Sequence, residues 1–194
     1  MKIKKIAAQV REQCRADIMD VTDGDGVVRQ WISTGVACYP VDGMPYLMPE
    51  HLPTVLDLTA KQTEEIRITR TEKTESMDFR DAVEHEIRAE GAGFAIYFSG
   101  IKALPLIANG IAYFVDAELL APILAEYKEV DFWLRRAESI TYFAVKFGLM
   151  VVGVVLPMTR MQDVTDEISE VMARYHDIPR RLGSLSPDNE EIEE

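Results

Sequence analysis

The sequence predicts an α+β protein, in which antiparallel sheets carry helices packed on one side. Runs dense in β-branched and aromatic residues, such as 130–136 and 141–158, are typical of half-buried strands. The segment 22–26 contains the pair Asp-Gly twice, and this pair favours tight hairpin turns because it tolerates a positive φ. Apolar residues at helical spacing occur between the strand-like runs, as in 117–127.

Helices and strands are predicted to alternate through the first half of the chain. Ile3, Ile6 and Val10 share one helical face, and Asp78 is a suitable N-cap for a helix whose apolar face begins at Phe79. In order, the predicted elements are a helix over 2–15, a hairpin over 16–33, an extended piece over 35–41, a short helix over 49–58, a strand over 62–70 and a helix over 78–90.

The second half is predicted to be rich in strands. Pro157 closes the apolar run 151–156, which is too short to span a bilayer. In order, the predicted elements are a hairpin over 94–107, a strand over 111–116, a helix over 117–127, strand runs over 130–136 and 141–158, the second broken by Gly148, and a helix over 161–176. Proline, glycine and an acidic run follow, which predicts a disordered tail over 179–194.

Composition is that of an ordinary soluble protein. The 194 residues carry a net charge of −12, which disfavours non-specific binding to nucleic acid or to an anionic membrane. The N-terminal lysines precede no apolar stretch of the kind found in a signal peptide, and the two cysteines have no metal or redox spacing. We therefore expect a cytoplasmic protein with reduced thiols and no membrane partner. From the chain length we expect a single domain over 1–178.

Two segments have the pattern of copies of one unit. The first runs from about 16 to 70 and the second from about 92 to 158, and each predicts the order hairpin, strand, helix, strand. A single unit would expose an apolar helix face and an apolar sheet face. Two units related by a pseudo-twofold would therefore share one core. A chance match in a chain rich in apolar residues is the alternative.

In the second unit, Asp116 precedes a predicted leucine-containing helix, and a predicted strand hairpin ends at Leu156-Pro157-Met158. In these features the unit resembles a repeat of the bacterial DNA polymerase processivity clamp, the sliding clamp. The resemblance implies two clamp-like pseudo-repeats, self-association into a ring, and a peptide-binding pocket lined by Leu156, Pro157 and Met158. With two repeats in the chain, a closed ring would need about six copies. The predicted helix over 161–176 has no counterpart in the family and could cover that pocket.

Six basic residues come near the ends of predicted strands and could form one DNA-facing surface. They are Arg67, Arg70, Lys73, Arg135, Arg136 and Lys146. Binding of DNA through such a surface would weaken with salt, because it releases counterions. Acidic residues lie close to these positions in the sequence. A solvated surface of mixed charge is therefore the simpler interpretation, and we prefer it.

No motif in the sequence points to catalysis, a metal or a cofactor. The acidic segment 20–26 lacks the ligand spacing of a calcium loop. His85-Glu86 lacks the second His of a zinc-protease helix, because Ala89 stands in its place. Cys38 lies in an apolar strand, where burial disfavours a reactive thiolate. We therefore predict no catalytic residue, no metal site and no cofactor.

Three functions are open from the sequence. The first is a non-enzymatic clamp-like protein, of a kind that a phage or mobile element could encode, acting in DNA replication or as a protein-interaction module. The second is a small regulatory or structural protein that uses the fold without DNA and offers an apolar patch to a partner. The third is an enzyme whose site is assembled from scattered acids. We rank the first slightly above the second.

Overall fold

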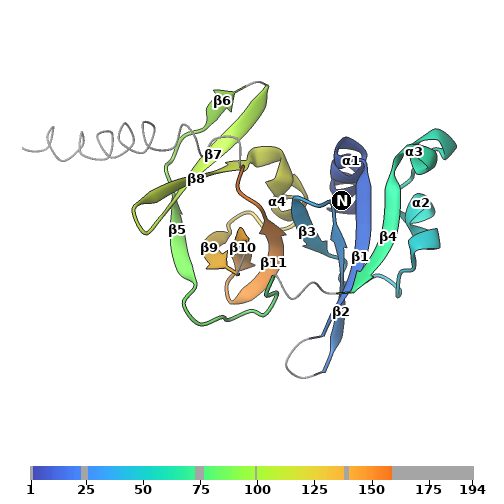
Figure 1. Ribbon diagram of the computed structural model, residues 1–194, viewed down its shortest axis with the longest axis horizontal. Coiled ribbons are helices and arrows are strands. Elements are labelled where there is room, and N and C mark those ends of the chain that lie inside the picture. The colour runs from blue at the N-terminus through green and yellow to red at the C-terminus, as the bar shows by residue number, and fades with distance from the viewer. Residues whose placement is uncertain (1, 23–25, 73–76, 99, 138–139, 159–194) are drawn as a thin grey trace, which may run out of the picture. The chain divides into compact units, whose positions relative to one another are not determined.

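The computed structural model describes residues 2–22, 26–72, 77–98, 100–137 and 140–158 (Figure 1). The contacts divide the chain between Met158 and Thr159, and the second unit lies wholly outside the described residues. The predicted helix over 161–176, the predicted tail over 179–194 and Lys73 therefore also lie outside them. Within the described part, no helix combines the length and the apolarity needed to cross a membrane.

Strands and short helices make up the described part of the chain, so the predicted α+β class is confirmed. The helices are α1 (Lys2–Gln13), α2 (Leu52–Val55), α3 (Ala60–Glu65) and α4 (Ala121–Leu124), with the 3-10 turns η1 (Pro49–His51) and η2 (Ala117–Leu120). The strands are β1 (Arg15–Thr22), β2 (Val28–Ser33), β3 (Ala37–Pro40), β4 (Arg67–Glu72), β5 (Ile87–Gly91), β6 (Ile96–Phe98), β7 (Ile101–Ala108), β8 (Ile111–Asp116), β9 (Asp131–Arg136), β10 (Thr141–Phe147) and β11 (Met150–Val155).

The strands form one mixed sheet. Its order is β4-β1-β2-β3-β11-β10-β9-β5-β7-β6, and β8 pairs with β7. β1 and β4 run parallel, whereas the other pairs among the described strands are antiparallel. Asn109 and Gly110 both have positive φ (52° and 77°) and make the turn between β7 and β8, as their residue types favour.

Two groups of four strands share one spatial order. The first is β4-β1-β2-β3, and the second is β9-β5-β7-β8. In the first group, the helical connection after β3 leads to β4, which lies beside β1. In the second group, the helical connection after β8 leads to β9, which lies beside β5. The returning strands differ in direction, because β4 is parallel to β1 and β9 is antiparallel to β5. The predicted repeat therefore stays a proposal.

The predicted helix over 78–90 is wrong. Residues 78–86 are irregular, and Ile87–Gly91 is strand β5, which pairs with β9 and β7. The guanidinium of Arg135 donates to the carbonyls of Asp78 and Arg80, which a helix would use within itself. Long-range contacts thus override the local helical pattern. The predicted strand over 62–70 also begins too early, because Thr59 and Gln62 form a capping box that starts α3.

Two clusters of buried side chains form the core, and the alternation of the strands divides the sheet residues between them. In the first cluster, Ile18, Ile32, Tyr39 and Phe143 pack with helical residues, among them Val10 of α1, Leu52 of α2 and Ile123 of α4. The second cluster contains no residue of a described helix. Its members are Met19, Val21, Trp31, Cys38, Phe79, Tyr142, Ala144, Val151 and Val154.

Candidate functional site

The residues predicted to line a peptide pocket follow the end of β11. The amide of Leu156 donates to the carbonyl of Val36 (2.9 Å), and the amide of Met158 donates to the carbonyl of Phe114 (2.7 Å). The segment therefore passes from β3 towards β8, with all three side chains half-buried. Leu156 packs against the second cluster, and it lines a small hollow of about 20 Å³ together with Met77 and Cys38.

Residues 77–86, here called the strap, cover the second cluster. In Figure 1 the strap is the green loop that leads into β5. Phe79 is 5% exposed, and its ring centroid lies 4.8 Å from that of Trp31 in β2. Met77 is half-buried against the same cluster. Two apolar side chains at alternate positions of the strap thus occupy an apolar face of the sheet.

Side chains of the sheet hold the strap by its backbone. Arg135 Nη1 donates to the carbonyls of Asp78 and Arg80, both at 2.8 Å. The amide of Asp78 donates to the hydroxyl of Tyr142 (2.8 Å). In return, the Asp81 carboxylate accepts from the amide of Val151 (2.8 Å). Among the described residues, no backbone-to-backbone hydrogen bond joins the strap to the sheet, so these side-chain contacts replace a strand ladder.

A buried ionic cluster closes the far end of the strap. Glu86 Oε2 accepts from Arg135 Nε (2.9 Å) and Nη2 (2.6 Å), and Glu86 Oε1 accepts from Lys146 Nζ. The side chains of Glu86, Arg135 and Lys146 are 11%, 2% and 5% exposed. Lys146 Nζ also lies 4.7 Å from the ring centroid of Trp133. One carboxylate therefore compensates two buried cations, which makes Glu86 the residue on which the cluster depends.

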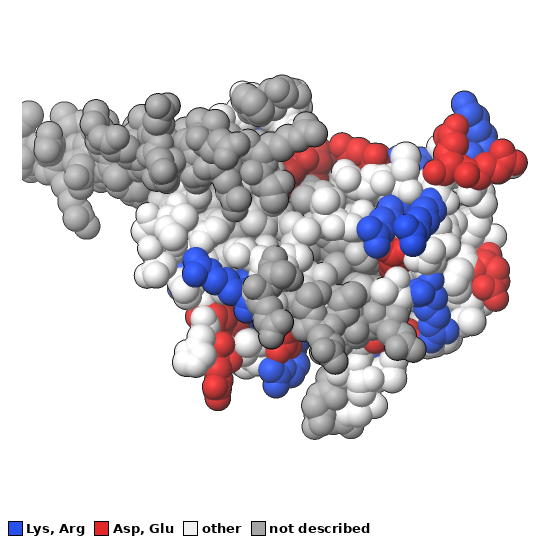
Figure 2. Space-filling model, in the orientation of Figure 1, with Lys and Arg blue, Asp and Glu red and all other residues white. Residues whose placement is uncertain are grey.

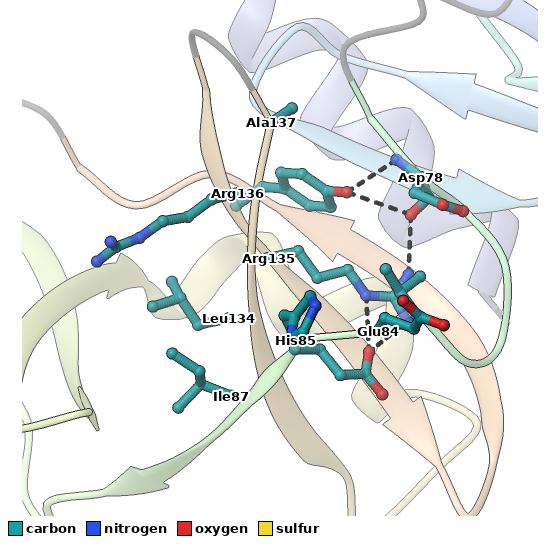
Figure 3. A pocket seen from close by; sticks show the side chains of 11 residues that line it. Asp78, Glu84, His85, Ile87, Leu134, Arg135, Arg136 and Ala137 are labelled. Carbon is teal, nitrogen blue, oxygen red and sulfur yellow. Dashed lines mark hydrogen bonds and ion pairs between the residues drawn. The ribbon is translucent and has the colours of Figure 1, made fainter.

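A pocket of about 450 Å³ lies between the second half of the strap and strands β9 and β10. Its lining is mixed: Asp78, Glu84, His85, Glu86, Arg135, Arg136 and Tyr142 are polar, and Val83, Ile87, Leu134 and Ala137 are apolar. Figure 3 shows Arg135 directed towards the strap, with Arg136 on the opposite side of β9. His85 has a φ of 65°, so the strap turns through a left-handed residue just before β5.

Burial controls the titration of the groups beneath the strap. Burial raises the pKa of the Cys38 thiol to about 11, although a hydrogen bond with Ser33 acts in the opposite direction. Burial also raises the pKa of Tyr142, and its hydrogen bond with the Asp78 backbone offsets part of that change. Cys38 is therefore an unreactive thiol at neutral pH.

Two of the six predicted DNA-facing residues are buried. Arg135 is 3% exposed and Lys146 is 4% exposed, and Glu86 compensates both charges. Their burial does not fit a DNA-facing role, because a phosphate could reach neither cation without opening the strap. The sequence shows the two residues near strand ends, but it does not reveal that a distant carboxylate joins them.

The other predicted DNA-facing residues that the structure describes do not lie together. Arg67 is exposed on β4, and Arg136 is exposed on β9, where it donates to the hydroxyl of Tyr113 (3.0 Å). Five strands separate β4 from β9 in the sheet order. Arg70 forms an ion pair with Asp20. On the face drawn in Figure 2, basic and acidic side chains are interspersed, which favours the interpretation of a mixed surface.

Arg70 belongs to a polar cluster that the sequence analysis missed. Burial would raise the pKa of Asp20, but hydrogen bonds from Tyr46, Gln30 and Arg70 outweigh it, so this pKa lies below its ordinary value. The guanidinium of Arg70 also lies 5.3 Å from the ring centroid of Tyr46. The Arg70 charge is thus neutralised on the surface of the protein.

The strap is the part of the site that sequence reasoning missed. Phe79 and Glu86 fall in the helix predicted over 78–90, although the alternation of Met77 and Phe79 about Asp78 is also the pattern of an extended segment with one buried face. Within the described part of the chain, no group of three or more His, Cys, Asp or Glu side chains is placed to hold a metal ion.

Comparisons of the chain with protein-family models, with curated proteins and with solved structures find no match.

Proposed function

We propose that this protein is a non-enzymatic, clamp-like protein that binds a partner peptide on the apolar sheet face beside Leu156-Pro157-Met158. The observation that carries the proposal is the second cluster. It lies on a sheet face with no described helix, and it continues to Leu156, the residue that the clamp resemblance places in a peptide pocket. An apolar groove with a few polar groups that hold a backbone is a common form of peptide recognition.

The arrangement of the sheet supports the clamp-like part of the proposal. Two groups of four strands share one spatial order, as expected of two pseudo-repeats. Self-association and action in DNA replication belong to the same proposal, through the resemblance of the second unit to a sliding-clamp repeat.

A regulatory or structural role without DNA is the second candidate. The burial of Arg135 and Lys146 favours it, as does the interspersed charge on the visible face (Figure 2). Binding to DNA needs accessible cations, because neutralisation of the phosphates supplies essentially all of the non-specific affinity. The two candidates therefore differ in DNA binding and share the peptide groove.

Light scattering on a sizing column at low and moderate salt tests self-association first. A discrete oligomer supports ring formation, whereas a monomer of 21.9 kDa refutes it. Anisotropy of a short labelled DNA duplex over a salt series separates the two candidates, since binding by a DNA clamp surface weakens steeply with salt. A panel of labelled peptides with two apolar side chains at alternate positions tests the groove. If no panel peptide binds either the unaltered protein or a Phe79→Ala variant, which lacks the side chain that packs on Trp31, the proposed groove is refuted.

A further inference from the structure

We propose that the strap is a displaceable internal ligand: it occupies, within the same chain, the apolar groove in which a partner peptide binds. The groove is the second cluster without Phe79, continued by Leu156. The identity of this groove as a partner site rests on the proposed function. The seating of the strap in it rests on the contacts described above.

The strap is bound as a peptide ligand is bound. Met77 and Phe79 are its anchors, and the residue between them, Asp78, pairs with Arg80 at the surface of the protein. Arg135 and Tyr142 satisfy backbone groups of the strap with side chains, as a receptor does for an extended peptide.

Two features make the strap separable from the sheet. A pocket of about 450 Å³ lies beside its second half, so part of that half faces open space and not packed side chains. In addition, the indole N–H of Trp31 is buried without an acceptor among the described residues, although Trp31 is 1% exposed and touches Phe79. A buried donor without a partner is unfavourable. Phe79 cannot satisfy this donor, whereas a peptide with a carbonyl at that place could.

The seated strap defines the chemistry of the partner. A competing peptide would carry two apolar side chains at alternate positions, the second of them aromatic, in an extended conformation. Because the strap is tethered to the sheet, its effective concentration at the groove is on the order of millimolar. The strap therefore competes with a partner peptide of moderate affinity, and that partner binds only after the strap has been released. Arg135 and Tyr142 would then hold the partner backbone as they now hold that of the strap.

Cys38 reports opening of the strap, because it is 3% exposed in the cluster that the strap covers. In the full-length Cys14→Ser protein it is the remaining cysteine, since the chain contains two. The rate of its alkylation is measured over a urea series below the unfolding transition. Local opening gives a rate that is nearly independent of urea, whereas global unfolding gives a steep dependence, because the urea slope scales with the surface exposed.

Two matched variants locate the opening. Phe79→Ala removes the strap anchor and is expected to raise the urea-independent rate roughly tenfold or more. Leu52→Ala removes a side chain of the first cluster and is expected to leave the urea-independent alkylation rate unchanged. The steeply urea-dependent alkylation, which reports global unfolding, should then begin at a lower urea concentration. Phe79→Leu, a milder change, replaces Phe79→Ala if the latter does not fold. Alkylation that follows global unfolding in every variant overturns the proposal.

A synthetic peptide of residues 75–82 then tests rebinding from solution. It is expected to slow the alkylation of Cys38 in the Phe79→Ala protein, and the same peptide with Phe replaced by Ala is expected to have no effect. Absence of protection by the intact peptide at millimolar concentration overturns the proposal. If the partner panel binds the unaltered protein as tightly as the Phe79→Ala protein, the strap is no barrier and the proposal fails while the proposed function stands. If the strap peptide rebinds but no panel peptide binds, the internal ligand stands and the proposed function fails.

Discussion

Replacement of Glu86 by Gln is expected to destabilise the protein by about 3–5 kcal/mol. The side chain keeps its shape but loses the charge that faces the buried cations Arg135 and Lys146. An uncompensated buried charge costs about that much when its partner is removed. The Gln amide nitrogen would also face a donor, because both carboxylate oxygens now accept hydrogen bonds. For a domain of this size the melting temperature should fall by roughly 6–20 °C.

Urea unfolding followed by circular dichroism measures the change, with Glu84→Gln as the matched control. Glu84 is exposed, and its replacement should alter the free energy of unfolding by less than about 0.5 kcal/mol. Lys146→Met tests the cause. It removes one of two cations and leaves the Arg135–Glu86 pair balanced, so it should cost much less than Glu86→Gln. A loss of less than about 1 kcal/mol in Glu86→Gln, or an equal loss in Lys146→Met, would refute the reasoning.

Three further changes test the packing, the titration and a turn. Gly153→Ala should lower the free energy of unfolding by about 1–3 kcal/mol, because a β-carbon there would lie 2.9 Å from Cγ1 of Ile123. Gly91→Ala is the control and should be neutral, since its β-carbon would meet nothing within 4 Å. Equal urea midpoints for the two variants would contradict the packing argument. Stability should fall between about pH 9 and pH 11, by roughly 3 kcal/mol, because the pKa of Cys38 is raised in the folded state from 9.0 to about 11 and the unfolded chain loses this proton first. The difference in unfolding free energy between the unaltered protein and Cys38→Ala over this range isolates the effect, and a pH-independent difference would count against it. Gly110→Ala should cost about 1 kcal/mol in thermal melts, since the β7–β8 turn holds Gly110 at a φ of 77°, and an unchanged melting temperature would show that the turn relaxes.

Local patterns were sufficient for much of the fold. The strand predicted over 111–116 is confirmed as β8, and the strand predicted over 130–136 is confirmed as β9 within one residue. Both runs combine β-branched or aromatic residues with a turn residue at one end, so local preference and burial agree. The helix predicted over 2–15 is confirmed as α1, although α1 ends at Gln13 and Arg15 begins β1. Its apolar stripe packs on the first cluster.

The strap could not be predicted, because the residues that hold it lie far away along the chain. Arg135 contacts the carbonyl of Asp78 across 57 positions, and Lys146 contacts Glu86 across 60. The local pattern over 78–90 favours a helix, but the carbonyls of Asp78 and Arg80 accept from Arg135 and not from helical amides. The same contacts changed the meaning of Arg135 and Lys146, which the sequence alone presented as basic residues near strand ends.

The sequence by itself determined the α+β class and most of the strands, because side-chain alternation acts over a few residues. The turn predicted over 22–26 includes residues 23–25, which lie outside the described residues. The sequence also supplied the segment Leu156-Pro157-Met158 as a candidate site, through a resemblance. The tertiary structure decided which strand lies beside which, and so which charges are buried. It also decided that Phe79 lies over Trp31, because hydrophobic burial and charge compensation join residues by their position in space and not by their order in the chain.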